Sequence, residues 1–111
     1  MKVEAIIRED CLDAVVGRLL LIHVQGLTVF PVKGAARGDA HRAVFRGSSY
    51  PVPFVSKLLI EWYGTDDEAE AVVRAIQRAA ATGTGGDGKI FVERVEEAVR
   101  IRTGERGLDA I

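Results

Sequence analysis

A glycine-rich stretch near the C-terminal end, residues 82–91, carries the residue types best suited to bind phosphate. It reads Thr-Gly-Thr-Gly-Gly-Asp-Gly-Lys-Ile-Phe and has four glycines within six residues. Glycine lets the main chain approach a ligand closely, and consecutive N–H groups in such a loop form a concave site for phosphate oxygens. Three cations, Lys89, Arg100 and Arg102, are expected to lie near the loop and suit phosphate well. Together these residues suggest a nucleotide site.

A simpler interpretation of the same stretch is a turn, which is what most glycine-rich segments form. The stretch is not the P-loop of nucleoside triphosphatases, because that motif needs Ser or Thr after its lysine and then a helix. Here Ile90 follows Lys89 and leads into a strand-like run. The residues alone therefore predict a phosphate-binding loop that enters a strand, with a plain turn as the alternative.

The size and composition favour one small cytoplasmic domain, residues 1–111. Hydrophobic residues make up 48% of the chain, and the net charge of -1 gives no basic field for nucleic acid. Cys11 is the only cysteine and has no partner at metal-ligand spacing, so we expect neither a disulfide nor a bound metal. We see no signal peptide, no membrane span, and no Ser/His/Asp or Cys/His arrangement of a catalytic site.

The hydrophobic periodicity predicts a strand, helix, strand, strand, helix, strand order. Strands are predicted at residues 1–8, 27–33, 57–63 and 89–95, and helices after Asp10 and after Thr65. Gly26 is expected to stop the first helix, and Thr65 with Glu68 forms a capping box for the second. This βαββαβ order is that of an α+β, ferredoxin-like sandwich.

Two further segments complete the outline. Residues 34–53 show no regular period and contain glycines and prolines, so they are predicted to form a long, flexible loop of the kind that is usually functional. The C-terminal tail, residues 98–111, contains Arg100–Arg102, which indicates a short edge strand.

The chain resembles the PII nitrogen-regulatory signal proteins over nearly its whole length. Residues 82–91 are similar to the C-terminal signature of that family, and Arg100–Glu105 to its tail. Other similar segments are residues 4–7, 25–29, 32–34, 45–47 with Tyr50, and 54–61. The resemblance implies a homotrimer that binds ATP, ADP or AMP between subunits, with Mg²⁺ as a possible companion ion and no prosthetic group.

The resemblance also implies a set of nucleotide-binding residues. Main-chain donors of the loop and Lys89 are expected to hold phosphates, while Arg100 and Arg102 neutralise them from across a subunit interface. The alternative is that these three side chains are ordinary surface cations exposed to solvent. The full set carried over by motif match is Thr28, Arg37, Glu61, Gly86, Asp87, Gly88, Lys89, Arg100 and Arg102.

Tyr63 departs from the family pattern, which has a small aliphatic residue at that position. An aromatic ring there is expected either to stack on adenine or to narrow the base pocket. The alternative is structural, with one ring of the Trp62–Tyr63 pair in the core and the other at a subunit interface.

The expected 2-oxoglutarate contacts are only half present. Lys57 matches the lysine that pairs with the 2-oxoglutarate carboxylate, but Gly38 replaces the glutamine that helps hold Mg-ATP-bound 2-oxoglutarate. Glycine has no side-chain oxygen to offer, although Asp39 beside it has one. We therefore expect a weak or absent response to 2-oxoglutarate.

The long loop has two further features. Tyr50 matches the tyrosine that some family members carry uridylylated, and an unmodified contact role is equally open. The loop is also basic, which suits an anionic effector such as bicarbonate or phosphate, or an acidic partner surface. Its basic residues are Lys33, Arg37, His41, Arg42 and Arg46.

The sequence therefore predicts a signal-transduction protein of nitrogen metabolism that is not an enzyme. Bound nucleotide would bias residues 34–53, which would grip or release a target transporter or enzyme, so any contact with a membrane is indirect. A regulator of carbon, bicarbonate or other transport that responds to ADP or AMP and an anion is the first alternative. A small nucleotide-hydrolysing enzyme and a purely structural trimer are the others.

Overall fold

A computed structural model of the chain describes residues 1–35, 43–45, 48–50 and 54–111. Two helices and four main strands form its body, in the predicted βαββαβ order. These elements are β1 (Lys2–Arg8), α1 (Leu12–Leu21), β2 (Thr28–Gly34), β5 (Val55–Tyr63), α2 (Asp66–Ala80) and β6 (Lys89–Glu93). Short 3₁₀ turns span Glu9–Cys11 and Gly107–Ala110.

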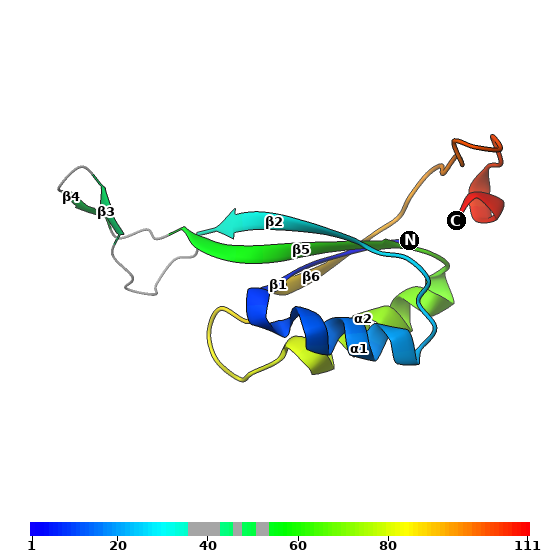
Figure 1. Ribbon diagram of the computed structural model, residues 1–111. Helices are drawn as coiled ribbons and strands as arrows, with labels where there is room; N and C mark the ends of the chain where they lie inside the picture. Colours follow the sequence, from blue (N-terminus) through cyan, green and yellow to red (C-terminus); the bar gives the residue numbers. More distant parts are fainter. Residues whose placement is uncertain (36–42, 46–47, 51–53) are drawn as a thin grey trace.

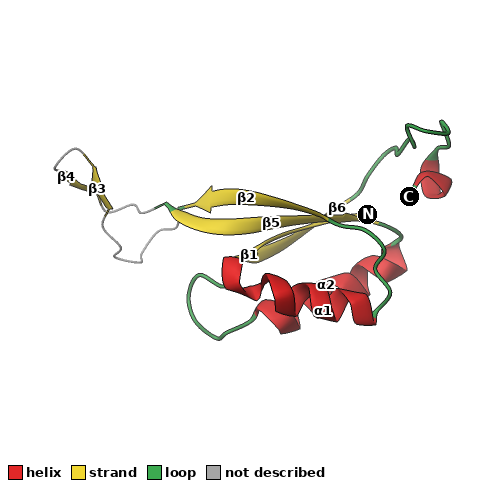
Figure 2. Ribbon diagram, viewed as in Figure 1, coloured by secondary structure: helices red, strands yellow, loops and turns green. Residues whose placement is uncertain are grey.

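The four strands form one antiparallel sheet in the order β2-β5-β1-β6. Val3 of β1 lies opposite Trp62 of β5 and Val92 of β6, which sets the register of the three strands. Both helices pack against the same face of this sheet (Figures 1 and 2). The α+β, ferredoxin-like fold predicted from the sequence is thus confirmed.

The core lies between the sheet and the two helices. Alternation along β1 sends Val3, Ala5 and Ile7 to the helix side, where each is at most 1% exposed. On each helix, apolar residues at helical spacing form one stripe that packs against these strand residues. Those fully buried stripe residues are Val15 and Leu19 on α1, and Val72 and Ile76 on α2.

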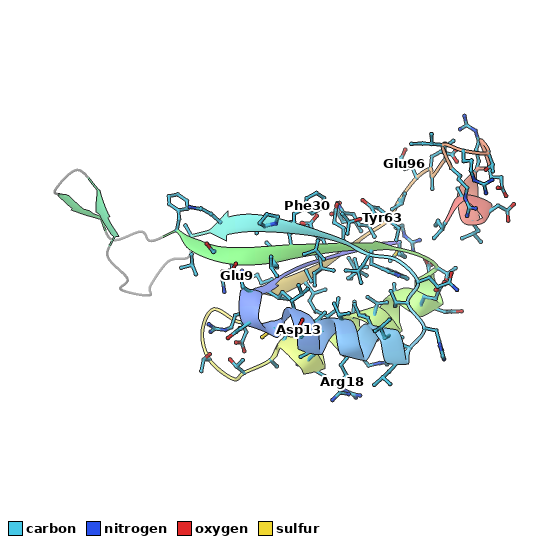
Figure 3. The ribbon with its side chains drawn as sticks, in the orientation of Figure 1. Glu9, Asp13, Arg18, Phe30, Tyr63 and Glu96 are labelled. Carbon is cyan, nitrogen blue, oxygen red and sulfur yellow. The ribbon has the colours of Figure 1, made fainter. Side chains whose placement is uncertain are left out.

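The other face of the sheet is covered by neither helix. The register places Phe30, Leu59 and Ile6 in one row across β2, β5 and β1, with Phe91 on β6 on the same face. Phe30 and Phe91 are 42% and 46% exposed in the single chain. Figure 3 shows Phe30 and Tyr63 on the side of the sheet away from the helices. An apolar sheet face of this kind normally packs against another surface.

Helix α2 begins as its sequence predicts. The Thr65 hydroxyl accepts a hydrogen bond from the Glu68 main-chain N–H, and the Glu68 carboxylate accepts one from the Thr65 N–H. This capping box satisfies donors that the first helical turn leaves without partners. The helix then runs to Ala80 and delivers the chain to the glycine-rich loop.

Two predicted features were wrong, and the last strand, β6, ends at Glu93, two residues before its predicted end. Helix α1 ends at Leu21, and His23, not Gly26, takes the left-handed conformation with φ 62°. Arg100–Arg102 form no edge strand: residues 101–103 lie in a turn, which a single bridge between Val99 and Arg106 closes. The Arg100 N–H donates to the Glu105 carbonyl within this turn, so it is engaged locally and not by the sheet.

The long connection between β2 and β5 contains more regular structure than its sequence indicated. Ala43–Phe45 (β3) and Ser48–Tyr50 (β4) pair as a separate two-stranded antiparallel unit. Periodicity over three residues is too short to stand out in a sequence. The loop's other predicted features lie outside the described residues; these are Arg37, Gly38, Asp39, His41, Arg42 and Arg46.

Candidate functional site

The glycine-rich loop, residues 82–88, joins the end of α2 to the start of β6. Gly83, Gly86 and Gly88 all have positive φ, at 83°, 89° and 104°. A Cβ atom at Gly88 would stand 1.7 Å from the Ile6 carbonyl oxygen of β1. Position 88 therefore requires glycine both for its conformation and for its close approach to the sheet.

Asp87 holds the loop closed on itself. Its carboxylate accepts hydrogen bonds from the Thr82 N–H at 2.7 Å and the Gly83 N–H at 3.0 Å, and from the Thr82 hydroxyl. Arg8 adds an ion pair through Nε at 3.1 Å. The two Thr82 hydrogen bonds, with Arg8 and Gly83, hold the pKa of the Asp87 carboxyl far below its usual range. Asp87 therefore remains ionised at physiological pH.

Two cations of the sheet meet this loop. Lys57 donates from Nζ to the Gly86 carbonyl, and Arg8, directly opposite Lys57 in the register, contacts Thr84 and Gly85 as well as Asp87. The sequence reasoning identified Lys57 but missed Arg8. The only signal for Arg8 was its place at the end of β1, on the face opposite the buried Ile7.

These residues line a cavity of about 540 Å³. Lys57, Gly86, Asp87, Gly88 and Lys89, all predicted site residues, meet there. The remaining lining residues are Ile6, Arg8, Gly34, Ala35, Val55, Thr84, Gly85 and Phe91. The cavity thus combines cations, main-chain amides and apolar side chains, a combination suited to a ligand with an anionic end and an apolar part.

Three other predicted residues lie farther along the same sheet face. Thr28 begins β2 and is paired with Glu61 of β5, and Tyr63 ends β5 opposite Lys2. Glu61 stands 3.8 Å from the Lys2 ammonium, which also pairs with Glu4 at 3.0 Å. The hydrogen bond that Lys2 donates to Glu4, together with the Glu61 charge, raises the pKa of Lys2.

The Trp62–Tyr63 pair divides between the two faces of the sheet. Trp62 is 5% exposed and belongs to the core, whereas Tyr63 is 45% exposed on the uncovered face. Only Tyr63 is therefore placed to contact a ligand or another subunit.

Arg100 and Arg102 are not near the glycine-rich loop of their own chain; the family resemblance implied that they reach it from across a subunit interface. The loop lies at the Arg8 end of β1, whereas tail residues Gly107 and Leu108 line a space with Met1 and Gly64 at the opposite end. The two ends of β1 are six residue steps apart, which corresponds to roughly 20 Å along the strand. Figure 1 shows the loop and the tail at opposite ends of the body. A single chain therefore cannot bring these arginines to Lys89.

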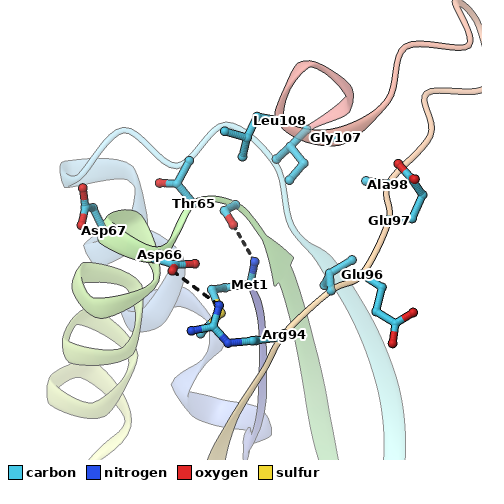
Figure 4. Close-up of a pocket in the computed structure, with 13 residues that line it drawn as sticks. Met1, Thr65, Asp66, Asp67, Arg94, Glu96, Glu97, Ala98, Gly107 and Leu108 are labelled. Carbon is cyan, nitrogen blue, oxygen red and sulfur yellow. Dashed lines mark hydrogen bonds and ion pairs between the residues drawn. The ribbon is translucent and has the colours of Figure 1, made fainter.

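The space beside the tail is a second cavity, of about 510 Å³. Its wall is rich in carboxylates, from Asp66, Asp67, Glu96 and Glu97. Arg94 faces Asp66 (Figure 4), and the two side chains are 3.8 Å apart. The Met1 ammonium donates to the Gly64 carbonyl at 2.9 Å. Because this wall is mainly anionic, it suits phosphate less well than the cationic cavity at the glycine-rich loop.

Some predictions lie beyond what the structure describes. Arg37 and Gly38 fall outside the described residues, as does the side chain of Tyr50, whose main chain ends β4. Among the residues that are described, no three His, Cys, Asp or Glu side chains gather as metal ligands. No described helix has the length and apolar character needed to cross a membrane.

Comparison with known proteins places this geometry in a family. Residues 1–105 match the family model described as "Nitrogen regulatory protein P-II". The chain is 51% identical over 110 residues to proteins of that name from Rhizobium meliloti, Bradyrhizobium diazoefficiens and Rhodospirillum rubrum. Each match covers 99% of this chain and 98% of the relative. The chain therefore belongs to the P-II family of nitrogen regulatory proteins.

Proposed function

We propose that this chain binds adenine nucleotides between the subunits of a trimer and uses the bound state to control a target protein. The family supplies the coarser frame, because its members are regulatory signal proteins of nitrogen metabolism that act as trimers, and are not enzymes. The nucleotide, its binding residues and the target are our proposal for this chain.

The observation that carries the proposal is the division of the cations between two ends of the molecule. Lys57, Lys89 and the loop amides meet at one cavity, while Arg100 and Arg102 stand on a turn at the far end. Ile101 between the two arginines is fully exposed. A site that uses all four cations has to combine the loop of one subunit with the tail of a neighbour.

The proposed roles follow from the chemistry of each residue. Lys89 and the N–H groups at Gly86, Asp87 and Gly88 hold the phosphates, and the neighbour's arginines offset the remaining negative charge. Thr28, Glu61 and Tyr63 face the base, which stacks on the Tyr63 ring. Arg37, at the base of residues 34–53, transmits the phosphate state to that segment, which binds the target.

Titration calorimetry with ATP, ADP and AMP, each with and without Mg²⁺, tests nucleotide binding. Lys89→Ala is expected to weaken ATP binding by about tenfold or more, the loss typical of a charged hydrogen bond. Arg74→Ala is the matched control, since Arg74 is an exposed cation on α2. A wild-type chain that binds no adenine nucleotide would refute the proposal and favour a structural trimer.

Subunit mixing tests where the site lies. A Lys89→Ala chain and an Arg100→Ala/Arg102→Ala chain each lack one half of every site, so neither alone is expected to bind tightly. When the two are unfolded together and refolded, about a quarter of the sites in random cyclic trimers regain both halves. Recovery of tight ATP binding at that fraction supports a shared site, and no recovery contradicts it.

The response to 2-oxoglutarate separates two branches of the proposal. Because Gly38 lacks a side-chain oxygen, we propose that 2-oxoglutarate has little or no effect on nucleotide binding. The Gly38→Gln variant is then expected to gain a response. A wild-type chain whose ATP affinity rises with 2-oxoglutarate would instead be an ordinary nitrogen sensor.

The second candidate function, regulation of bicarbonate or other transport, draws on the basic residues of segment 34–53. It predicts that bicarbonate or phosphate changes the ADP or AMP affinity. Phosphate release from ATP, measured beside Lys89→Ala, tests the enzyme alternative. Turnover that disappears in that variant would overturn the regulatory assignment.

A further inference from the structure

Arg8 stands at the junction of the sheet and the glycine-rich loop. It ends β1, and its register partner on β5 is Lys57. Like charges directly opposite each other on neighbouring strands repel, so this pair requires compensation. The compensation comes from the loop, which folds over both side chains.

The Arg8 guanidinium contacts three different residues of the loop. Its Nε lies 3.1 Å from an Asp87 carboxylate oxygen, and its Nη2 donates to the Thr84 hydroxyl at 2.9 Å and to the Gly85 carbonyl. The rigid planar fork of arginine holds several acceptors at once, which the single ammonium of lysine does not. Arg8 thus fixes the loop to the sheet at three points.

These contacts set the direction of the loop's main chain. In a trans peptide the carbonyl and the N–H point in opposite directions, and none of the described residues has a cis peptide bond. Because Arg8 holds the Gly85 carbonyl, the Gly86 N–H points away from Arg8. In the same way, Lys57 holds the Gly86 carbonyl, so the Asp87 N–H points away from Lys57. A glycine-rich segment has little conformational preference of its own, so this orientation depends on the contacts.

We propose that Arg8 is a positioning residue of the nucleotide site, which aims the N–H donors of the glycine-rich loop at the phosphates. This inference rests on the proposed function. Its Nε and Nη2 donate to protein acceptors, so Arg8 acts through the loop.

The first test compares Arg8→Met and Arg8→Lys with wild type by titration calorimetry. Arg8→Met is expected to weaken ATP and ADP binding by a similar factor, about tenfold. Arg8→Lys retains the charge without the fork and is expected to recover only part of the loss. Arg18→Met, an exposed arginine on α1, is the control and leaves both affinities unchanged. Full recovery by lysine, or a loss confined to ATP, would overturn the proposal in favour of a charge that acts on the ligand directly.

A double-mutant cycle with Thr84→Val tests whether Arg8 acts through the loop. Arg8 and Thr84 share a hydrogen bond, so the effects of the two changes on ATP affinity are expected to be less than additive. Strict additivity would contradict the proposal.

Hydrogen exchange of residues 82–88 in the nucleotide-free protein provides a test that needs no ligand. Arg8→Met is expected to speed exchange there and Arg18→Met to leave it unchanged. If the wild type binds no nucleotide, the proposed function fails, whereas faster exchange still shows that Arg8 orders the loop. Unchanged exchange rejects Arg8 as a positioning residue. If Arg8→Met does not fold, Arg8→Lys and Thr84→Val carry the same comparison.

Discussion

Asp87 joins several parts of the glycine-rich loop through one carboxylate. It accepts from the Thr82 hydroxyl, from the Thr82 and Gly83 main chain and from the Arg8 side chain. Each of these donors favours the ionised form, which is why the pKa of Asp87 is depressed. The Asp87 charge therefore stabilises the conformation of the loop independently of any ligand.

The first prediction concerns the pH dependence of this carboxylate. A depressed pKa in the folded protein contributes stability above the unfolded value, which is lost as the pH falls below it. Asp87 is thus expected to leave the stability of the protein independent of pH between about pH 5 and pH 8. Below about pH 4 its protonation is expected to lower that stability. The thermal unfolding temperature should fall less steeply with decreasing pH for Asp87→Asn than for wild type. Parallel curves at low pH would contradict the assignment.

The second prediction concerns Gly88. Alanine there combines a left-handed conformation, which alone costs about 1–3 kcal/mol, with a Cβ atom 1.7 Å from the Ile6 carbonyl. Gly88→Ala is expected to lower the free energy of unfolding by at least that amount and to abolish tight nucleotide binding. Gly17→Ala, in α1 with open space around it, should instead stabilise the chain by roughly 0.5–1 kcal/mol. Equal stability of the two variants in urea unfolding would refute this account.

At the scale of the elements, α2 and β1 together define the ends of the loop. The capping box fixes where α2 starts, and helical periodicity carries it to Ala80. Strand β1 supplies both the Ile6 carbonyl beneath Gly88 and the Arg8 side chain beside Asp87. The loop therefore depends on two elements that the sequence predicts well.

The third prediction separates the stability of α2 from the chemistry of the site. Thr65→Ala removes the cap and is expected to cost about 1 kcal/mol in urea unfolding at fixed chain concentration. Thr65→Ser keeps the hydroxyl and should cost much less. Because Thr65 lies at the end of α2 remote from the loop, both variants should retain wild-type ATP affinity. A large loss of affinity in Thr65→Ala would contradict that separation.

At the scale of the whole molecule, a single chain leaves too much apolar surface uncovered. The uncovered sheet face carries Phe30 and Phe91, and the tail exposes Val99, Ile101 and Leu108. This exposed apolar surface is typical of a subunit that packs against other copies.

The fourth prediction tests that assembly. Wild type is expected to have three times the 12.0 kDa chain mass by light scattering. Leu59→Asp places a charge in the centre of the uncovered face, which is expected to dissociate the trimer and, with it, tight nucleotide binding. Leu21→Asp is the control, since Leu21 is 75% exposed at the end of α1. A monomeric wild type, or an intact Leu59→Asp trimer, would contradict the assignment of this face.

The sequence by itself determined the order of the elements, the helix cap and the glycine-rich loop. These are local properties, set by hydrophobic period, by a side chain that bonds its own helix end and by glycine's freedom at positive φ. Lys57 and Tyr63 were predicted from the family resemblance, Lys57 as the match to a ligand-binding lysine and Tyr63 as a departure from the family pattern.

Only the tertiary structure decided which of these residues share a site. Arg8 is 79 residues from Asp87 in sequence, and no motif connects them until β1 and the loop meet. Arg100 and Arg102 follow the loop closely in sequence, yet the extended β6 carries them to the opposite end of the sheet. Trp62 and Tyr63 are neighbours that the strand sends to opposite faces. Distance along the chain does not predict distance in space once a strand extends by about 3.3 Å per residue and alternates its side chains.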